Sequence, residues 1–179
     1  MSDLNSALAS SVDLDKVKSN NNRVESLTSV VQNMVSEIVD NACKTLDSYM
    51  SLIDEILCDK NQPVSDEELE DFTLNLPSML YTVSAAREGL KVKEDVSRAI
   101  YKDVYNRVRE KAQGTVADKD TAADLAAQSE AITVIVLQRA VSTIKTREEA
   151  AWEMLNSVKK VLTRRTVELE LSRQSGGSL

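Results

Sequence analysis

The chain lacks histidine altogether and has few glycines, prolines and aromatic residues. Without histidine, the commonest general base and a common metal ligand are both missing. The four glycines are too widely scattered to form a phosphate-binding loop or a dinucleotide fingerprint. The acidic run SDEELED leaves a carboxylate magnesium site as the one metal option, against the plainer interpretation of a capped, solvated helix start. We therefore expect a protein that is not an enzyme and that uses no metal or cofactor.

The two cysteines and the apolar runs set further limits. Cys43 and Cys58 lie 15 residues apart on one expected helix, which places them about 22 Å from each other. This is too far for a disulfide, and the spacing fits no zinc site, so we expect buried, reduced thiols. The longest apolar run, AITVIVLQRA, is interrupted by Gln138 and Arg139, far short of the ~20 residues that span a membrane. With no signal-peptide pattern in the first residues, the sequence predicts a cytoplasmic protein without a membrane partner.

Scarce turn residues and apolar residues at spacings of three and four predict an all-α fold of long helices. A break at Pro63 is followed by a capping box, Ser65 with Glu68, and Pro77 and Gly114 mark further boundaries. The expected helices cover about 23–58, 66–74, 77–112 and 120–172. They form a single helical domain, 23–173, between a flexible segment 1–22 and a disordered tail 174–179.

Helices of this length with short connections predict an antiparallel bundle or coiled coil. The expected last helix, 120–172, would span roughly 75 Å, more than a compact domain of this size requires. Such a helix projects, and its apolar stripe is then available to a partner. We therefore expect a homo-oligomer in which the chain associates with itself.

Charge is distributed unevenly along the chain. Residues 1–85 carry 5 Lys and Arg against 15 Asp and Glu, a net charge of −10, whereas residues 86–179 carry 17 against 14, a net charge of +3. This layout suggests a bipolar surface, although ordinary solvated helix faces would give the same count.

The most informative segment is a basic amphipathic stretch near the C-terminus. At 100° per residue, the only tryptophan borders a strip of cationic side chains on one broad helix face. The candidate contacts are Lys145, Trp152, Lys159, Lys160, Arg164 and Arg165. Cations that follow phosphates, beside a ring that stacks on a base, are typical of single-stranded nucleic-acid binding. The alternative is that Trp152 packs into a helix interface and the lysines only keep the protein soluble.

A second group of cations, Arg107, Arg109 and Lys111, ends the third expected helix. Tyr101 and Tyr105, one turn apart, could add stacking surface to it. Alternatively, these cations simply favour the C-terminal end of the helix dipole.

The segment from Gly114 to Ser172 resembles phage recombination mediators of the UvsY-like kind. It shares with them a charged turn, an alanine-rich helical entry and a helix that ends in a basic segment, here KKVLTRR. The resemblance implies a ring-like homo-oligomer that binds single-stranded DNA and helps to load a recombinase by displacing a single-strand-binding protein. It implies DNA contacts at Lys159, Lys160, Arg164 and Arg165. The chain departs from that pattern in its acidic pI of about 4.8 and its acidic N-terminal helix.

Three hypotheses follow from the sequence. The first is a single-stranded DNA-binding accessory protein, a mediator of phage recombination or replication, which partners a recombinase or single-strand-binding protein. The second is a helical structural, scaffolding or coiled-coil interaction protein of a virion. The third is an inhibitor of a host nucleic-acid enzyme, in which the acidic half imitates nucleic-acid charge.

Overall fold

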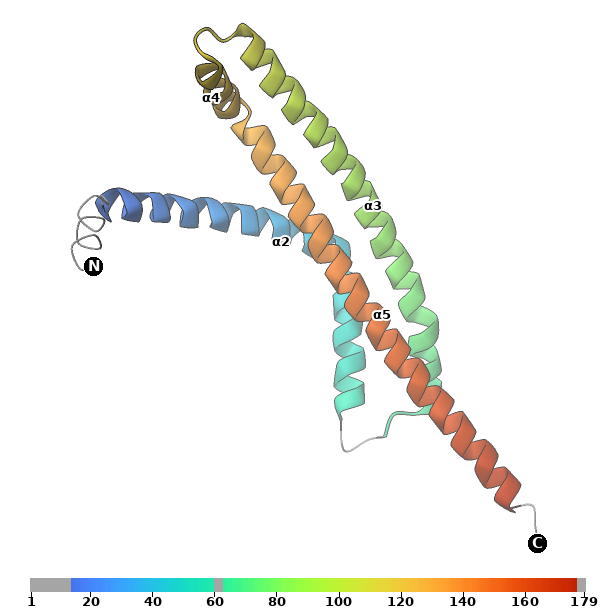
Figure 1. The fold of residues 1–179 in the computed structure, drawn as a ribbon. Coiled ribbons are helices and arrows are strands. Elements are labelled where there is room, and N and C mark those ends of the chain that lie inside the picture. The colour runs from blue at the N-terminus through green and yellow to red at the C-terminus, as the bar shows by residue number, and fades with distance from the viewer. Residues whose placement is uncertain (1–13, 60–62, 177–179) are drawn as a thin grey trace, which may run out of the picture.

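The protein is all-α, as predicted, with four helices packed in a bundle (Figure 1). The structure is a computed structural model that describes residues 14–59 and 63–176. The helices are α2 (Leu14–Cys58), α3 (Asp66–Lys111), α4 (Val116–Ala126) and α5 (Gln128–Gly176). In Figure 1, α3 and α5 run antiparallel along most of their length, and the second half of α2 lies against them. Among the described residues, no helix has the length and apolar character to cross a membrane.

The core lies where α2, α3 and α5 overlap. Each contributes an apolar stripe at the three- and four-residue spacing that the sequence shows. The largest fully buried side chains include Val39, Leu46 and Ile53 from α2, Leu69 and Leu76 from α3, and Ile144, Leu155 and Val158 from α5. Burial of each stabilises the fold by about 1.5–3 kcal/mol. This three-helix contact fixes how α3 and α5 lie side by side.

The prediction of two separate helices, 66–74 and 77–112, is wrong. One helix, α3, runs from Asp66 to Lys111 with Pro77 inside it. The buried side chains Leu69, Phe72, Leu76, Leu80 and Val83 continue at helical spacing on both sides of the proline. A proline inside a helix costs about 3 kcal/mol, which is less than the burial of these side chains contributes. Packing therefore keeps the helix continuous.

The start of the first helix also differs from the prediction. The segment 1–22 was expected to be flexible, but α2 begins at Leu14, so residues 14–22 are helical; residues 1–13 lie outside the described part. The amide of Asn21 donates to the carboxylate of Glu25 at 2.7 Å, four residues on. An asparagine bonded in this way supports the helix instead of competing with it. Of the expected tail 174–179, residues 174–176 belong to α5 and the rest lie outside the described part.

The expected helix 120–172 is divided in two. The capping box Ser65–Glu68 is confirmed, and Thr115 with Asp118 forms a second one that starts α4 at Val116. Gly114 adopts a φ of 113°, a turn conformation that favours glycine, just before this cap. Ala127, with φ −97° and ψ 11°, separates α4 from α5. The chain can therefore bend back here, so that α4 packs on the end of α3.

The cysteines lie on the same helix, as expected, but only one is buried. Cys43 belongs to the core, and its burial raises the pKa of the thiol. Cys58, at the last residue of α2, is exposed, so the prediction of two buried thiols is wrong for it. In the same last turn Ile56 packs against the core, so Cys58 lies on the face of α2 that points away from it.

The proline in α3 generates a testable prediction. Replacement of Pro77 by alanine restores the backbone N–H that pairs with the Thr73 carbonyl and removes the steric clash of the ring. We expect Pro77→Ala to raise the free energy of unfolding by about 2 kcal/mol, measured by urea denaturation. Ser78→Ala is the matched control, with an expected change within about 0.5 kcal/mol. A loss of stability in Pro77→Ala would show that the proline is required by the packing around it.

Candidate nucleic-acid interface

The structure divides the candidate contacts between two separate places. Trp152, Lys159 and their neighbours lie on the second half of α5, beside the start of α3. The group Arg107, Arg109 and Lys111 lies at the other end of the long axis, where α3 meets α4 (Figure 1). Because α3 and α5 are antiparallel, the two groups do not form one surface.

The α5 group forms a line along one face of the helix. Trp152 is half exposed, and Asn156, Lys159 and Thr163 follow it at steps of three or four residues, all exposed. These three residues line a shallow depression together with Lys160 and Arg164. Among the described residues, Lys159 and Lys160 enter no ion pair. We call Trp152, Asn156, Lys159, Lys160 and Thr163 the α5 line.

A groove between α3 and α5 begins at the tryptophan. It has a volume of about 500 Å³, and Pro77, Tyr81, Lys145, Glu149 and Trp152 are among its lining residues. Tyr81 is 78% exposed, so both faces of the groove present an aromatic ring to solvent.

Sequence reasoning missed Tyr81. The interhelical pairs Arg87–Glu148 and Asp66–Arg165 bracket the stretch in which α3 passes Trp152. An antiparallel alignment of the two expected helices would have indicated that this residue lies near Trp152.

Three of the predicted cations near the line are already engaged. Lys145 pairs with Glu149 at 3.5 Å, and Arg164 with Glu168 at 2.8 Å, each within α5. Arg165 donates to the Val64 carbonyl at 2.6 Å and to the Asp66 carboxylate at 2.9 Å. These two hydrogen bonds hold α5 against the start of α3. In this structure Arg165 therefore stabilises the contact between the two helices.

The second group holds α3 against α4. Arg109 donates to Asp120 at 2.5 Å, and the hydroxyl of Tyr105 donates to the same carboxylate at 3.3 Å. Burial, followed by the nearby Asp120 charge, raises the pKa of Tyr105. Arg107 pairs with Asp103 on its own helix, whereas Lys111 is exposed and has no ion pair among the described residues.

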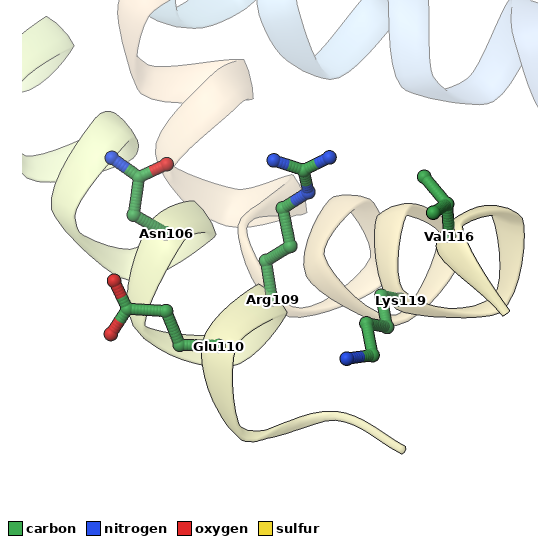
Figure 2. Close-up of a pocket in the computed structure, with 5 residues that line it drawn as sticks. All are labelled: Asn106, Arg109, Glu110, Val116 and Lys119. Carbon is green, nitrogen blue, oxygen red and sulfur yellow. The ribbon is translucent and has the colours of Figure 1, made fainter. Parts of the chain in front are cut away.

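A small cavity of about 330 Å³ lies at this junction (Figure 2). Asn106 and Glu110 from α3 line it together with Val116 and Lys119 from α4, and Arg109 lies between them. Cations and carboxylates are mixed here, and the tyrosine rings Tyr101 and Tyr105 lie 6.1 Å apart, against each other. The junction therefore has the features of an interhelical contact more than those of an anion-binding surface.

One ion pair is buried in the groove. Arg87 of α3 and Glu148 of α5 meet at 3.1 Å, with side chains only 18% and 9% exposed. The pair contacts through a single N–O pair, and Arg87 Nε and Glu148 Oε1 have no hydrogen-bond partner among the described residues. Burial raises the pKa of Glu148 above its ordinary value, and the attraction of Arg87 only partly offsets this. The folded protein thus binds this proton more tightly than the unfolded chain, so the contribution of Glu148 to stability decreases as pH rises from about 4.5.

The pair gives a prediction with a defined pH dependence. Arg87→Ala leaves a buried carboxylate unpaired, and we expect a loss of about 3 kcal/mol in the free energy of unfolding near pH 7.5. The loss should shrink as pH is lowered toward about 5, because protonation of Glu148 removes the unpaired charge. Arg107→Ala, which breaks an exposed pair with Asp103 on the same helix, should cost no more than about 0.5 kcal/mol at either pH. Urea denaturation at both pH values measures this, and an Arg87→Ala loss independent of pH would contradict the role given to Glu148.

No protein-family model, no curated protein and no solved structure matches this chain. Among the described residues, no group of three or more cysteine or acidic side chains is placed to hold a metal ion. The function proposed next therefore rests on the geometry of the α5 line and its groove, and on the resemblance of the C-terminal sequence.

Proposed function

We propose that this protein is a single-stranded DNA-binding accessory protein, a mediator of phage recombination or replication, which acts as a homo-oligomer. The observation that carries the proposal is the α5 line. A half-exposed tryptophan is followed along α5 by two exposed lysines that form no ion pair with any residue the structure describes. Single-stranded DNA offers both groups a partner, since its bases stack on aromatic rings and its phosphates attract lysines.

The groove extends this surface toward α3. Tyr81 lies on the opposite wall from Trp152, so successive unstacked bases could contact two rings. A strand that leaves the groove along α5 meets Lys159 and Lys160 within about two turns. Neither contact reads base identity, so we expect little sequence preference.

The C-terminal resemblance supports the same function. Of the four contacts that the resemblance implies, Lys159 and Lys160 are exposed without ion pairs, and Arg164 is 82% exposed although it pairs with Glu168. The acidic half of the chain, with a net charge of −10 over residues 1–85, would limit binding elsewhere and suit a basic protein partner. A recombinase or a single-strand-binding protein is the partner that this function requires.

A second candidate is a structural or scaffolding protein without nucleic acid. It is favoured by the apolar side chains that the first half of α2 exposes, which include Val24, Leu27 and Met34. Titration of the protein with oligonucleotide separates the two functions. Trp152 is the only tryptophan, so a change in its fluorescence reports directly on the groove.

The lysines of the α5 line provide the first test. We expect the double variant Lys159→Gln/Lys160→Gln to bind a labelled oligothymidine about tenfold more weakly, measured by fluorescence anisotropy. Its slope of log K against log salt should fall by about 1.4 between 50 and 200 mM salt, since each phosphate contact on a single strand contributes about 0.7. Lys93→Gln/Lys102→Gln, which makes the same charge change on exposed positions of α3, is the matched control and should bind as the wild type does. Salt-independent binding would contradict phosphate contacts.

The aromatic walls of the groove provide the second test. Tyr81→Ala removes a stacking surface and should weaken binding by about tenfold, since stacking on one base contributes about 1–3 kcal/mol. Tyr101→Ala, which removes a tyrosine from the far end of α3, is the control and should leave binding unchanged. Equal binding by wild type and Tyr81→Ala would remove α3 from the interface.

A further inference from the structure

The first half of α2 exposes an apolar stripe that the rest of the described structure leaves uncovered. In Figure 1 this part of the helix projects from the bundle, and none of its side chains from residue 16 to residue 34 is buried. We call residues 16–36 the arm. Its apolar residues recur at steps of seven, three, four and three: Val17, Val24, Leu27, Val31 and Met34. Val24 is 59% exposed and Leu27 41%, although the spacing is that of a packing seam.

The composition of the arm favours a partner that covers its apolar stripe. Asn20, Asn21 and Asn22 stand in its first turns, and serine, threonine and valine dominate the rest. These residues form helices poorly, and a helix of this length in water gains most of its stability from the packing of an apolar face. The sequence of the arm therefore supports a helix only weakly. Packing of its apolar stripe against a partner would explain why the arm is helical.

We propose that the arm pairs antiparallel with the arm of a second copy of this chain. This pairing is the interface of the homo-oligomer in the proposed function. The inference rests only on the self-association in that proposal and not on the binding of DNA. With Val24 opposite Met34 of the partner subunit, Leu27 lies opposite Val31 of the partner subunit. Two-fold symmetry then repeats both contacts, so that four apolar layers close the seam.

Charge selects the antiparallel direction. Residues 15–23 carry Lys16, Lys18 and Arg23 against one acid, Asp15, whereas residues 37–47 carry three acids and one lysine. Two of these acids, Asp40 and Asp47, also contact Arg147 of the same chain. In the same register, Lys18 lies opposite Asp40 of the partner subunit. Asp40 contacts Arg147 of its own chain at 3.5 Å but remains 67% exposed, so it can also face a cation from outside. A parallel pair would instead place the cationic ends of both arms together, where like charges repel.

The shape of the chain permits this pairing. The arm leaves the bundle to one side in Figure 1. In an antiparallel pair the two bundles therefore lie beyond opposite ends of the seam, whereas a parallel pair would bring them to the same end.

The oligomeric state of the full chain, without nucleic acid, tests the interface. We expect the wild type to sediment as a dimer or a multiple of a dimer, and Leu27→Asp to lose this association by at least tenfold in dissociation constant. Circular dichroism should show that the variant also loses helix, because the arm then stands alone. Leu171→Asp, at a position 59% exposed near the end of α5, is the matched control and should associate as the wild type does. A monomeric wild type, as expected if residues 1–13 or a different protein cover the stripe, or a Leu27→Asp variant that associates unchanged, overturns the proposal.

Spin labels determine the direction of the pair. In a Cys58→Ser background, which removes the exposed thiol, labels at Ser29→Cys should lie within about 25 Å of each other, since paired helix axes are 8–10 Å apart. Labels at Ser19→Cys should be separated by about 30 Å or more along the axis. Short distances at both positions would indicate a parallel pair and overturn the proposal.

Binding of oligonucleotide is measured separately on the same variants. If the protein is a dimer that does not bind the oligonucleotide, only the proposed function is contradicted. If it is a monomer that binds the oligonucleotide, only the proposed interface is contradicted.

Discussion

The fold depends on the burial of three apolar stripes over a stretch that is shorter than the helices themselves. Helices of 45, 46 and 49 residues share a core only where the second half of α2 meets the first half of α3 and the middle of α5. Beyond that stretch α3 and α5 still pack on each other and on α4, where Ala123 and Ala127 are buried, whereas the first half of α2 leaves its apolar side chains exposed. This explains why α3 tolerates Pro77, which lies within the shared core, and why the arm of α2, which lies outside it, exposes Val24 and Leu27.

Arginine and lysine have different roles in this structure. Each ion pair between helices that the structure shows in its described part uses an arginine: Arg87 with Glu148, Arg109 with Asp120, Arg147 with Asp40 and Asp47, and Arg165 with Asp66. The planar, weakly hydrated guanidinium suits such contacts, whereas the ammonium group of lysine stays strongly hydrated. The lysine pairs, Lys91 with Glu88 and Lys145 with Glu149, remain within one helix. The two lysines of the α5 line form no interhelical ion pair with a described residue. Their charges therefore stay exposed on the helix surface.

The sequence predicted the presence of long helices more accurately than the residues at which they begin and end. It also predicted them more accurately than the candidate site. Periodic apolar residues and the Ser65–Glu68 capping box are local signals, and both are confirmed. The break at Pro77 was wrong because a local penalty was outweighed by packing with residues more than 60 positions away, such as Ile144 and Leu155. In the candidate site, Trp152 and its lysines follow from one helix face, but Tyr81 and the engagement of Arg165 with Asp66 depend on how two helices align. Pairing of this kind has no signature within either helix alone.

The two proposals together resolve the conflict between a strongly acidic chain and a DNA-binding surface. The two lysines of each α5 line give a weak electrostatic contact, and a net charge of −7 opposes it. In the antiparallel dimer, each bundle carries its own α5 line at one end of the paired arms. A strand long enough to reach both lines binds the second one at the high effective concentration set by the first. Affinity would then come from the number of lines that one strand contacts, while a short strand would be released easily, as the proposed mediator function requires.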